Sequence, residues 1–145
     1  MQKQNCKRHD KKTCRYNKKN RRKYCLKAHI VLVTKYRRHL LGNPLDIDVK
    51  QKIMDLACRK GYQVISMETD KDHIHLLLGY YATDRICDIV KAIKQETTHY
   101  LWGKHKSILA KHYWEKKIFW SSGYFACSIG EVSAETIERY IASQG

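Results

Sequence analysis

The order of strand and helix patterns constrains the fold of this chain most strongly. Residues 62–68 alternate between apolar and polar residues, a tight turn follows at 70–72, and residues 73–79 form a second strand pattern. These two strands are predicted to form a β-hairpin. A helical pattern precedes the hairpin at residues 46–60, and another follows it from Thr83, the expected N-cap of a long helix. The hairpin therefore lies between two helices in the chain.

Further strand patterns lie on either side of this region. Residues 24–34 are apolar and β-branched, which is typical of a buried strand, and residues 118–129 predict a last strand broken near Gly123. Residues 104–117 are expected to be a shorter helix or a loop, and Ser133 is the expected N-cap of a C-terminal helix. The β-α-β-β-α-β series predicts an α+β, ferredoxin-like (RRM-like) fold, with an antiparallel sheet, two helices on one face and a further C-terminal helix.

Positive charge is concentrated at the N-terminus. The 145 residues include 29 Lys and Arg and 14 Asp and Glu, which gives a net charge of +15. Residues 1–23 hold eleven of those bases and one acid, or +10 of the total. A basic arm of this kind attracts nucleic acid, although a solvated tail that only aids solubility is the alternative. We interpret residues 1–22 as a basic, flexible arm and residues 23–145 as the folded domain.

Hydropathy and cysteine usage indicate a cytoplasmic protein without a membrane partner. The sequence has neither an apolar run long enough to span a bilayer nor an N-terminal secretory signal. The six cysteines are therefore expected to be reduced. Cys6, His9 and Cys14 would form only part of a zinc site. Cys58 and Cys87 fall within apolar patterns and are predicted to be small core residues.

Two histidines on the second hairpin strand are candidates for metal binding. Residues two apart in a strand point to the same face, so His73 and His75 share one face while Ile74 points into the core. Two such imidazoles can share a divalent ion, although a structural or merely exposed pair is the alternative. Asp70 and Asp72 flank the pair, and they could orient an imidazole or simply shape the turn.

The C-terminal helix supplies a candidate nucleophile. Tyr140 and Gln144 are four residues apart and lie on one helix face, beside an apolar stripe formed by Ile137 and Ile141. A packing tyrosine and a surface glutamine are the alternative interpretation. A tyrosine hydroxyl becomes a useful nucleophile toward a phosphodiester when a metal ion polarises the phosphate and stabilises the departing oxygen.

Together, these side chains predict a single site. We expect His73, His75 and Gln144 to bind the metal and Tyr140 to act as the nucleophile. Imidazole and amide ligands with bound water suit Mg²⁺ or Mn²⁺, while a histidine pair also suits Zn²⁺ and Co²⁺.

The sequence resembles the single-tyrosine HUH transposases of the smallest insertion sequences (TnpA type), named for their histidine–hydrophobic–histidine motif. The resemblance covers about residues 24–145. The matching segments, in chain order, are AHIVLVTKYRR (28–38), DLACRKGYQVISMETDKDHIHLLL (55–78), IVKAIKQETTHYL (89–101) and ERYIASQ (138–144).

The resemblance implies an enzyme that cleaves and rejoins single-stranded DNA at insertion-sequence ends and recognises subterminal hairpins. Tyr140 would attack a phosphodiester, keep the 5′ phosphate as a phosphotyrosine and release a 3′ hydroxyl. His73, His75 and Gln144 would hold the metal. Such enzymes work as homodimers, and the tyrosine helix often completes the partner's active site. Assembly of the site within one subunit or across two therefore stays open.

Six further side chains are candidates for contacts with DNA phosphates. The first four match the basic cluster of the family, and the last two lie on the second predicted helix, where they could face DNA or solvent. They are Lys35, Tyr36, Arg37, Arg38, Lys91 and Lys94. Trp114 and Tyr124 could stack on unpaired bases, whereas Phe119 and Trp120 fit a core or a dimer interface better.

Two other functions remain open at this point. A domesticated or replication-type HUH endonuclease would use the same chemistry on repeated hairpins. A non-catalytic, basic nucleic-acid-binding module of ferredoxin-like fold would show neither metal dependence nor a covalent adduct with DNA.

Overall fold

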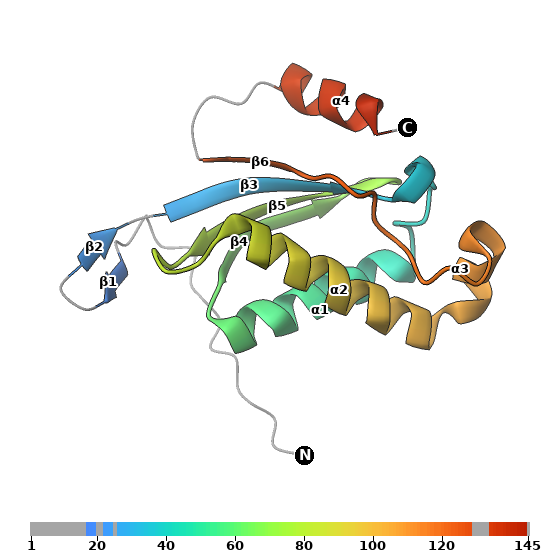
Figure 1. Cartoon of the computed structure of the whole chain (residues 1–145), viewed down its shortest axis with the longest axis horizontal. Coiled ribbons are helices and arrows are strands. Elements are labelled where there is room, and N and C mark those ends of the chain that lie inside the picture. The colour runs from blue at the N-terminus through green and yellow to red at the C-terminus, as the bar shows by residue number, and fades with distance from the viewer. Residues whose placement is uncertain (1–16, 20–21, 25, 129–133, 145) are drawn as a thin grey trace, which may run out of the picture.

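A four-stranded antiparallel sheet forms the centre of the molecule (Figure 1). The structure, a computed structural model, describes residues 17–19, 22–24, 26–128 and 134–144. The order of the strands across the sheet is β4-β5-β3-β6. Their bounds are β3 (Leu26–Val33), β4 (Gln63–Thr69), β5 (His73–Tyr80) and β6 (Phe125–Ser128).

Two long helices cover one face of the sheet, and the C-terminal helix lies over the other (Figure 1). The helices are α1 (Leu45–Lys60), α2 (Ile86–Lys104), α3 (Lys106–Tyr113) and α4 (Ala134–Ser143). A 3-10 turn, η1 (Lys35–Arg37), follows β3. Across the expected boundary between the N-terminal arm and the domain, β1 (Asn17–Lys19) and β2 (Arg22–Tyr24) form a separate two-stranded antiparallel sheet.

The connections confirm the predicted ferredoxin-like fold. β3, α1 and β4 form one β-α-β unit, and β5 lies between its two strands. β5, α2 and β6 form the second unit, and β3 lies between those strands. Two interleaved units of this kind are the split β-α-β arrangement that the order of patterns predicts. Gly61 ends α1 in a left-handed conformation (φ 84°), which glycine adopts without steric cost.

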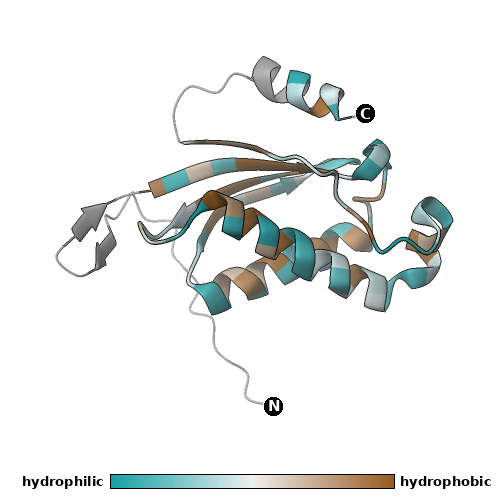
Figure 2. Ribbon diagram, viewed as in Figure 1, coloured by the Kyte–Doolittle hydropathy of each residue, from teal (hydrophilic) through white to brown (hydrophobic). Residues whose placement is uncertain are grey.

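The main core lies between the sheet and the two long helices. Ile74, Leu76 and Leu78 alternate along β5 and are at most 1% exposed on this face. Ile53 of α1 and Ile93 of α2 pack into the same cluster. Figure 2 shows the apolar residues along the central strands and on these helices. The opposite face of β5 is left with His73, His75 and Leu77, because neighbouring side chains in a strand alternate.

A smaller apolar cluster holds α4 on that opposite face. Ile141 packs with Val31 and Val33 of β3, and Phe125 and Tyr140 lie against them. The helix that carries the candidate nucleophile is thus docked on β3, the strand next to the one that carries the histidines. The side chain of Ile137 lies outside the described residues.

Several local predictions were wrong. α2 begins at Ile86 with Arg85 as N-cap, not at Thr83, because the carboxylate of Asp84 instead accepts a hydrogen bond from the backbone N–H of Tyr81 (3.0 Å). Cys58 is exposed, since it lies beside, not within, the buried stripe of α1.

Two further corrections concern Cys87 and the last strand. Cys87 is exposed, because α2 buries the positions that follow it. The last strand is much shorter than residues 118–129: only β6 pairs continuously with β3, and Trp120 forms an isolated bridge with Thr34. Ser133, Cys6, His9 and Cys14 lie outside the described residues. Within the described part of the chain, no helix is long and apolar enough to cross a membrane.

Candidate active site on the sheet

The two histidines of β5 lie side by side on the α4 face of the sheet. Their ring centroids are 4.9 Å apart, and the rings meet edge to face. Burial lowers the pKa of His75, and the neighbouring His73 lowers it further. A lowered pKa keeps the imidazole neutral, and the neutral ring has the lone pair that a metal ion needs.

Asp72 fixes the orientation of His73. One oxygen of its carboxylate, Oδ1, lies 2.8 Å from Nδ1 of His73, and the other, Oδ2, accepts a hydrogen bond from Nε of Arg37 at 3.1 Å. Burial raises the pKa of Asp72, but the hydrogen bonds from His73 and Arg37 outweigh it and hold the pKa below its usual value. With Nδ1 donating to this carboxylate, Nε2 of His73 is left with its lone pair facing away from Asp72.

The turn that carries Arg37 has a strained backbone. Tyr36 (φ 58°) and Arg37 (φ 51°) both adopt the left-handed region, which costs a residue with a Cβ about 1–2 kcal/mol. The hydroxyl of Thr34 donates to the carbonyl of Arg38 (2.7 Å), and the hydroxyl of Tyr113 donates to that of Lys35 (2.9 Å). These bonds hold the turn in a conformation that its own residues disfavour. Strain of this kind is found preferentially at functional sites.

Tyr36 is presented to solvent between two cations. Its side chain is 54% exposed, and its ring packs at a tilt on Tyr113. The ammonium of Lys35 lies 5.3 Å from the ring centroid, and the guanidinium of Arg38 lies 6.0 Å from it. An exposed ring flanked by positive charges can stack on a base while the cations contact the adjoining phosphates.

Tyr140 projects from α4 onto the same sheet face. Its ring lies 5.5 Å from the ring of Phe125, centroid to centroid. Its hydroxyl is buried and has no hydrogen-bond partner among the described residues, and burial raises its pKa. A buried hydroxyl without a partner costs stability, so packing alone does not account for a tyrosine here.

Gln144 lies one helical turn further along. Its Oε1 accepts a hydrogen bond from the hydroxyl of Ser121 at 3.4 Å. A Cβ added to Gly123 would come within 3.4 Å of both Gln144 Oε1 and the Tyr140 hydroxyl oxygen. The amide oxygen of Gln144 and the hydroxyl oxygen of Tyr140 therefore both lie close to the backbone of Gly123.

Strand register relates the two halves of the site. His75, Val31 and Phe125 are directly opposite one another across β5, β3 and β6. Neighbouring strands are about 4.8 Å apart, so the Cα atoms of His75 and of Phe125, beneath Tyr140, are separated by about 10 Å. The structure thus brings His73, His75, Tyr140 and Gln144 to one face of the sheet, as the sequence predicts; their catalytic and ligand roles stay predictions.

The two candidate lysines of α2 differ in their surroundings. Lys91 is exposed. The ammonium of Lys94 donates hydrogen bonds to the backbone carbonyls of Ser121 (2.8 Å), Ser122 (3.2 Å) and Gly123 (2.7 Å), and burial lowers its pKa. All three of its donors are thereby directed to the protein, so Lys94 supports the segment beneath Gln144 and does not project toward a ligand.

The predicted metal ligands carry donor atoms of the kind that bind a divalent ion with open coordination positions. Within the described ranges, no group of three or more His, Cys, Asp or Glu side chains could hold a metal ion. His73, His75 and the amide oxygen of Gln144 would supply at most three ligands, which leaves positions for water or phosphate oxygens. The neutral His75 and the oriented His73 are suitable donors.

Sequence reasoning missed three residues that support this site. Ser121 and Gly123 contact Gln144 and Tyr140, yet they fall in a segment whose pattern resembles a strand. Arg37 was expected to bind DNA, and its ion pair with Asp72, 35 residues further along, has no signal in the sequence. The position of Asp72 directly before His73 was the only available indication.

The sheet order, the adjacent histidines of β5 and the tyrosine helix docked on β3 and β6 match the arrangement that the sequence resemblance implies. The sequence model of the IS200-like transposases matches residues 22–144, and the chain belongs to this family.

Individual relatives agree with this assignment. The chain is 31% identical over 121 residues to the ISDra2 transposase TnpA of Deinococcus radiodurans. The aligned region covers 83% of this chain and 85% of the relative. It is 26% identical over 118 residues to the transposase for insertion sequence element IS200 of Salmonella typhimurium, with 81% and 76% coverage.

Solved structures show the same fold. A crystal structure of a candidate transposase from Deinococcus radiodurans R1 superposes with a TM-score of 0.81 at 27% identity, covering 88% of this chain and 97% of that one. A tyrosine transposase described as bound to a REP hairpin superposes with a TM-score of 0.55 at 12% identity, covering 86% and 68%. The second likeness shows the fold alone.

Proposed function

We propose that this transposase cleaves and rejoins single-stranded DNA at insertion-sequence ends through a covalent 5′-phosphotyrosine on Tyr140. The observation that carries the proposal is the buried Tyr140 hydroxyl, which has no hydrogen-bond partner among the described residues and lies on the same sheet face as His73 and His75. A purely structural tyrosine has no reason to bury an unpaired hydroxyl on this face of the sheet.

The chemistry is an exchange of phosphodiester bonds. The Tyr140 oxygen attacks the phosphorus, a bond forms between them, and the bond from phosphorus to the 3′ oxygen breaks. The phenol loses its proton and the departing 3′ oxygen gains one. In the reverse direction, a 3′ hydroxyl attacks the phosphotyrosine and restores both a DNA strand and the tyrosine. Because each step conserves one phosphodiester, no nucleotide cofactor is needed.

A divalent ion, Mg²⁺ or Mn²⁺, would polarise the phosphate and stabilise charge on the departing oxygen. His73, His75 and Gln144 would hold it. Asp72 keeps the Nδ1 proton of His73 in place, and Ser121 orients the amide of Gln144. The raised pKa of Tyr140 keeps its proton on the phenol until substrate and metal are both present.

The DNA strand would approach along the strained turn. Nε of Arg37 is directed to Asp72, and its side chain is 40% exposed, so the terminal amino groups can contact a phosphate. Tyr36, Lys35 and Arg38 would hold the adjoining nucleotide, and the exposed Lys91 would add a further phosphate contact. Recognition of subterminal hairpins and action as a homodimer, with the site within one subunit or shared between two, belong to the same proposal.

Labelled DNA tests this proposal. Single-stranded substrates carrying candidate end hairpins are labelled at the 5′ or the 3′ end and incubated with the protein, with and without Mn²⁺ or Mg²⁺. The proposal predicts a protein–DNA adduct that survives SDS and retains only the 3′ label, because the 5′ phosphate of the downstream fragment is bound to protein. Tight binding without an adduct would instead support a non-catalytic binding module.

A further inference from the structure

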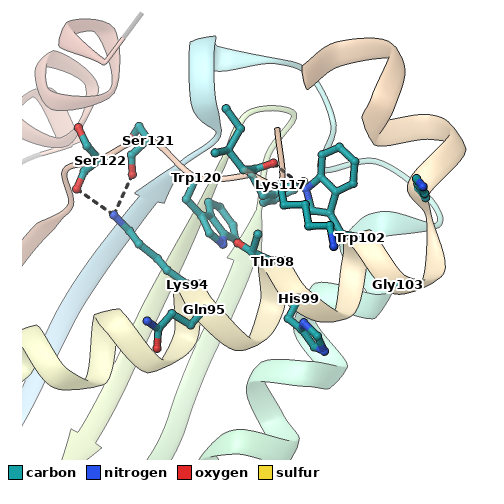
Figure 3. Close-up of a pocket in the computed structure, with 13 residues that line it drawn as sticks. Lys94, Gln95, Thr98, His99, Trp102, Gly103, Lys117, Trp120, Ser121 and Ser122 are labelled. Atoms are coloured by element: carbon teal, nitrogen blue, oxygen red, sulfur yellow. Dashed lines mark hydrogen bonds between the residues drawn. The ribbon is translucent and has the colours of Figure 1, made fainter. Parts of the chain in front are cut away.

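A cavity of about 620 Å³ lies outside the proposed active site, between the C-terminal half of α2 and residues 117–122, which lead into β6 (Figure 3). Gln95, Thr98, His99 and Trp102 line it from α2, and Trp120 lines it from the facing segment. None of the four side chains proposed as nucleophile or metal ligands lines this cavity.

The deeper part of the cavity is aromatic and firmly held. Trp102 and Trp120 are 5% and 7% exposed. The indole N–H of Trp102 donates to the carbonyl of Ile118 (2.9 Å), and that of Trp120 donates to the hydroxyl of Thr97 (2.8 Å). Since both donors are satisfied within the protein, the rings offer only apolar and π surface to a ligand.

The rim of the cavity is polar and carries no negative charge. Lys106 and Lys117 are exposed there, and no acidic residue lines the cavity. The side chains of Gln95, Thr98 and His99 form no hydrogen bond with another described residue, so their donors and acceptors are available to a ligand. Aromatic surface, available hydrogen-bonding groups and exposed lysines in one cavity together match a nucleobase and its phosphate.

One wall of the cavity also supports the proposed active site. Lys94 holds the carbonyls of Ser121 and Ser122 on the cavity side (Figure 3). The hydroxyl of Ser121 bonds to Gln144, and Gly123 lies beside the Tyr140 hydroxyl. A DNA strand attached at Tyr140 would therefore lie on the other side of this segment from the cavity.

We infer that the cavity between α2 and residues 117–122 binds an unpaired nucleobase of the single-stranded DNA substrate, close to the phosphodiester that is cleaved. The inference rests on the proposed function and adds a base-binding site to it. It distinguishes single strands from duplexes, because a paired and stacked base cannot enter a cavity of this kind without leaving its partner.

A filled cavity tests the inference. A Cβ added at Gly103, which lines the cavity, meets no atom within 4 Å, so Gly103→Leu starts a side chain there from an unobstructed Cβ. Gly42 also has open space around it and does not line the cavity, so Gly42→Leu is the matched control. Both are made in a Trp114→Phe background, which leaves Trp102 and Trp120, both in the cavity, as the fluorescent residues.

The probe is a short oligothymidylate without a hairpin, titrated at fixed salt, with a blunt duplex for comparison. We expect the single strand to quench tryptophan fluorescence in the parent and in Gly42→Leu. We expect Gly103→Leu to lose the quenching and to bind the single strand about tenfold more weakly, the range for loss of one base contact. The duplex should not quench the tryptophan fluorescence of the parent or of either glycine variant.

Three results would overturn the inference: equal quenching in Gly103→Leu and parent, equal quenching by duplex and single strand, or a change in oligomeric state in Gly103→Leu, which would make the cavity a contact between copies of the chain. The adduct assay on the Trp114→Phe parent separates this inference from the proposed function. If the protein forms the DNA adduct but Gly103→Leu changes neither quenching nor affinity, the base site is contradicted and the proposed chemistry stands. If Gly103→Leu loses the quenching but the parent forms no adduct, the proposed chemistry is contradicted and the base site stands.

Discussion

Oδ1 of Asp72 lies 2.8 Å from Nδ1 of His73, so the residue directly before the first histidine of the motif fixes the direction of that histidine. The carboxylate is itself held by Arg37, in a side chain that is only 9% exposed. The first histidine is therefore oriented before any ligand is present, and its second nitrogen faces away from the carboxylate.

Asp72→Asn tests this orienting role. The amide keeps the shape of the side chain but loses the charge, and it can offer only one acceptor oxygen to His73 and Arg37. We expect the affinity for Mn²⁺ to fall about 10- to 100-fold, the usual effect of removing an outer partner of a ligating histidine. Titration calorimetry of the protein without DNA measures the change.

Asp70→Asn is the matched control, because Asp70 is exposed in the same turn and forms its hydrogen bond with the backbone of Lys71. The affinity of this control for Mn²⁺ should stay within about twofold of the original. An equal loss in both variants would indicate a general electrostatic effect and would contradict a specific role for Asp72.

Tyr140→Phe should separate stability from function. The Tyr140 hydroxyl is buried and has no partner among the described residues, so its removal relieves a desolvation cost of about 1 kcal/mol or more. We expect a higher melting temperature together with complete loss of the DNA adduct and unchanged hairpin binding. Thermal unfolding and a gel-shift assay measure the two properties. A lower melting temperature would show that the hydroxyl has a structural partner.

Much of the fold could be predicted from the sequence because its signals are local. The alternation of β4 and β5, and the glycine that ends α1, each depend on a few neighbouring residues. The failures at Cys58 and Cys87 have a common reason. Both are small residues near an apolar stripe, and periodicity alone does not resolve a position at the edge of a stripe from one within it.

The candidate reactive residues of the site could be predicted from the sequence, but the residues that hold them in place could not. A strand places residues two apart on one face, as for His73 and His75. A helix places residues four apart on one face, as for Tyr140 and Gln144. The supporting segment at residues 121–123 is held by Lys94, 27 residues before Ser121, which donates hydrogen bonds to its carbonyls. Such a contact depends on the packed arrangement of α2 against the segment, which no local pattern encodes.

Lys94 and Lys91 are therefore expected to behave differently. Lys94→Met removes three hydrogen bonds, two of them part-buried, and leaves the carbonyls of Ser121 and Gly123 without this donor, so we expect a loss of about 1–3 kcal/mol in the free energy of unfolding. Lys91→Met at an exposed position should leave stability within about 0.5 kcal/mol and weaken DNA binding at low salt. Urea denaturation measures the stability of each. Equal stability of the two variants would contradict the supporting role of Lys94.

Tyr36→Asn tests the strained turn. Asparagine tolerates the left-handed region better than tyrosine, so stability should be unchanged or higher by a few tenths of a kcal/mol. Loss of the exposed ring between Lys35 and Arg38 should weaken binding of single-stranded DNA about tenfold. Fluorescence anisotropy with a labelled oligonucleotide measures the affinity, and Tyr36→Phe, which keeps the ring, should bind like the original protein.

The central claim, that Tyr140 forms the covalent bond to DNA, is tested most directly by locating the nucleotide in the trapped adduct. The adduct is isolated under denaturing conditions, its DNA is trimmed with nuclease, and the protein is digested with trypsin and analysed by mass spectrometry. Arg139 precedes the tyrosine, so digestion separates Tyr140 from the other nine tyrosines, in the peptide that begins at residue 140. The account predicts a nucleotide joined through its 5′ phosphate to this peptide. A nucleotide on any other tyrosine, or an adduct that persists in Tyr140→Phe, would contradict it.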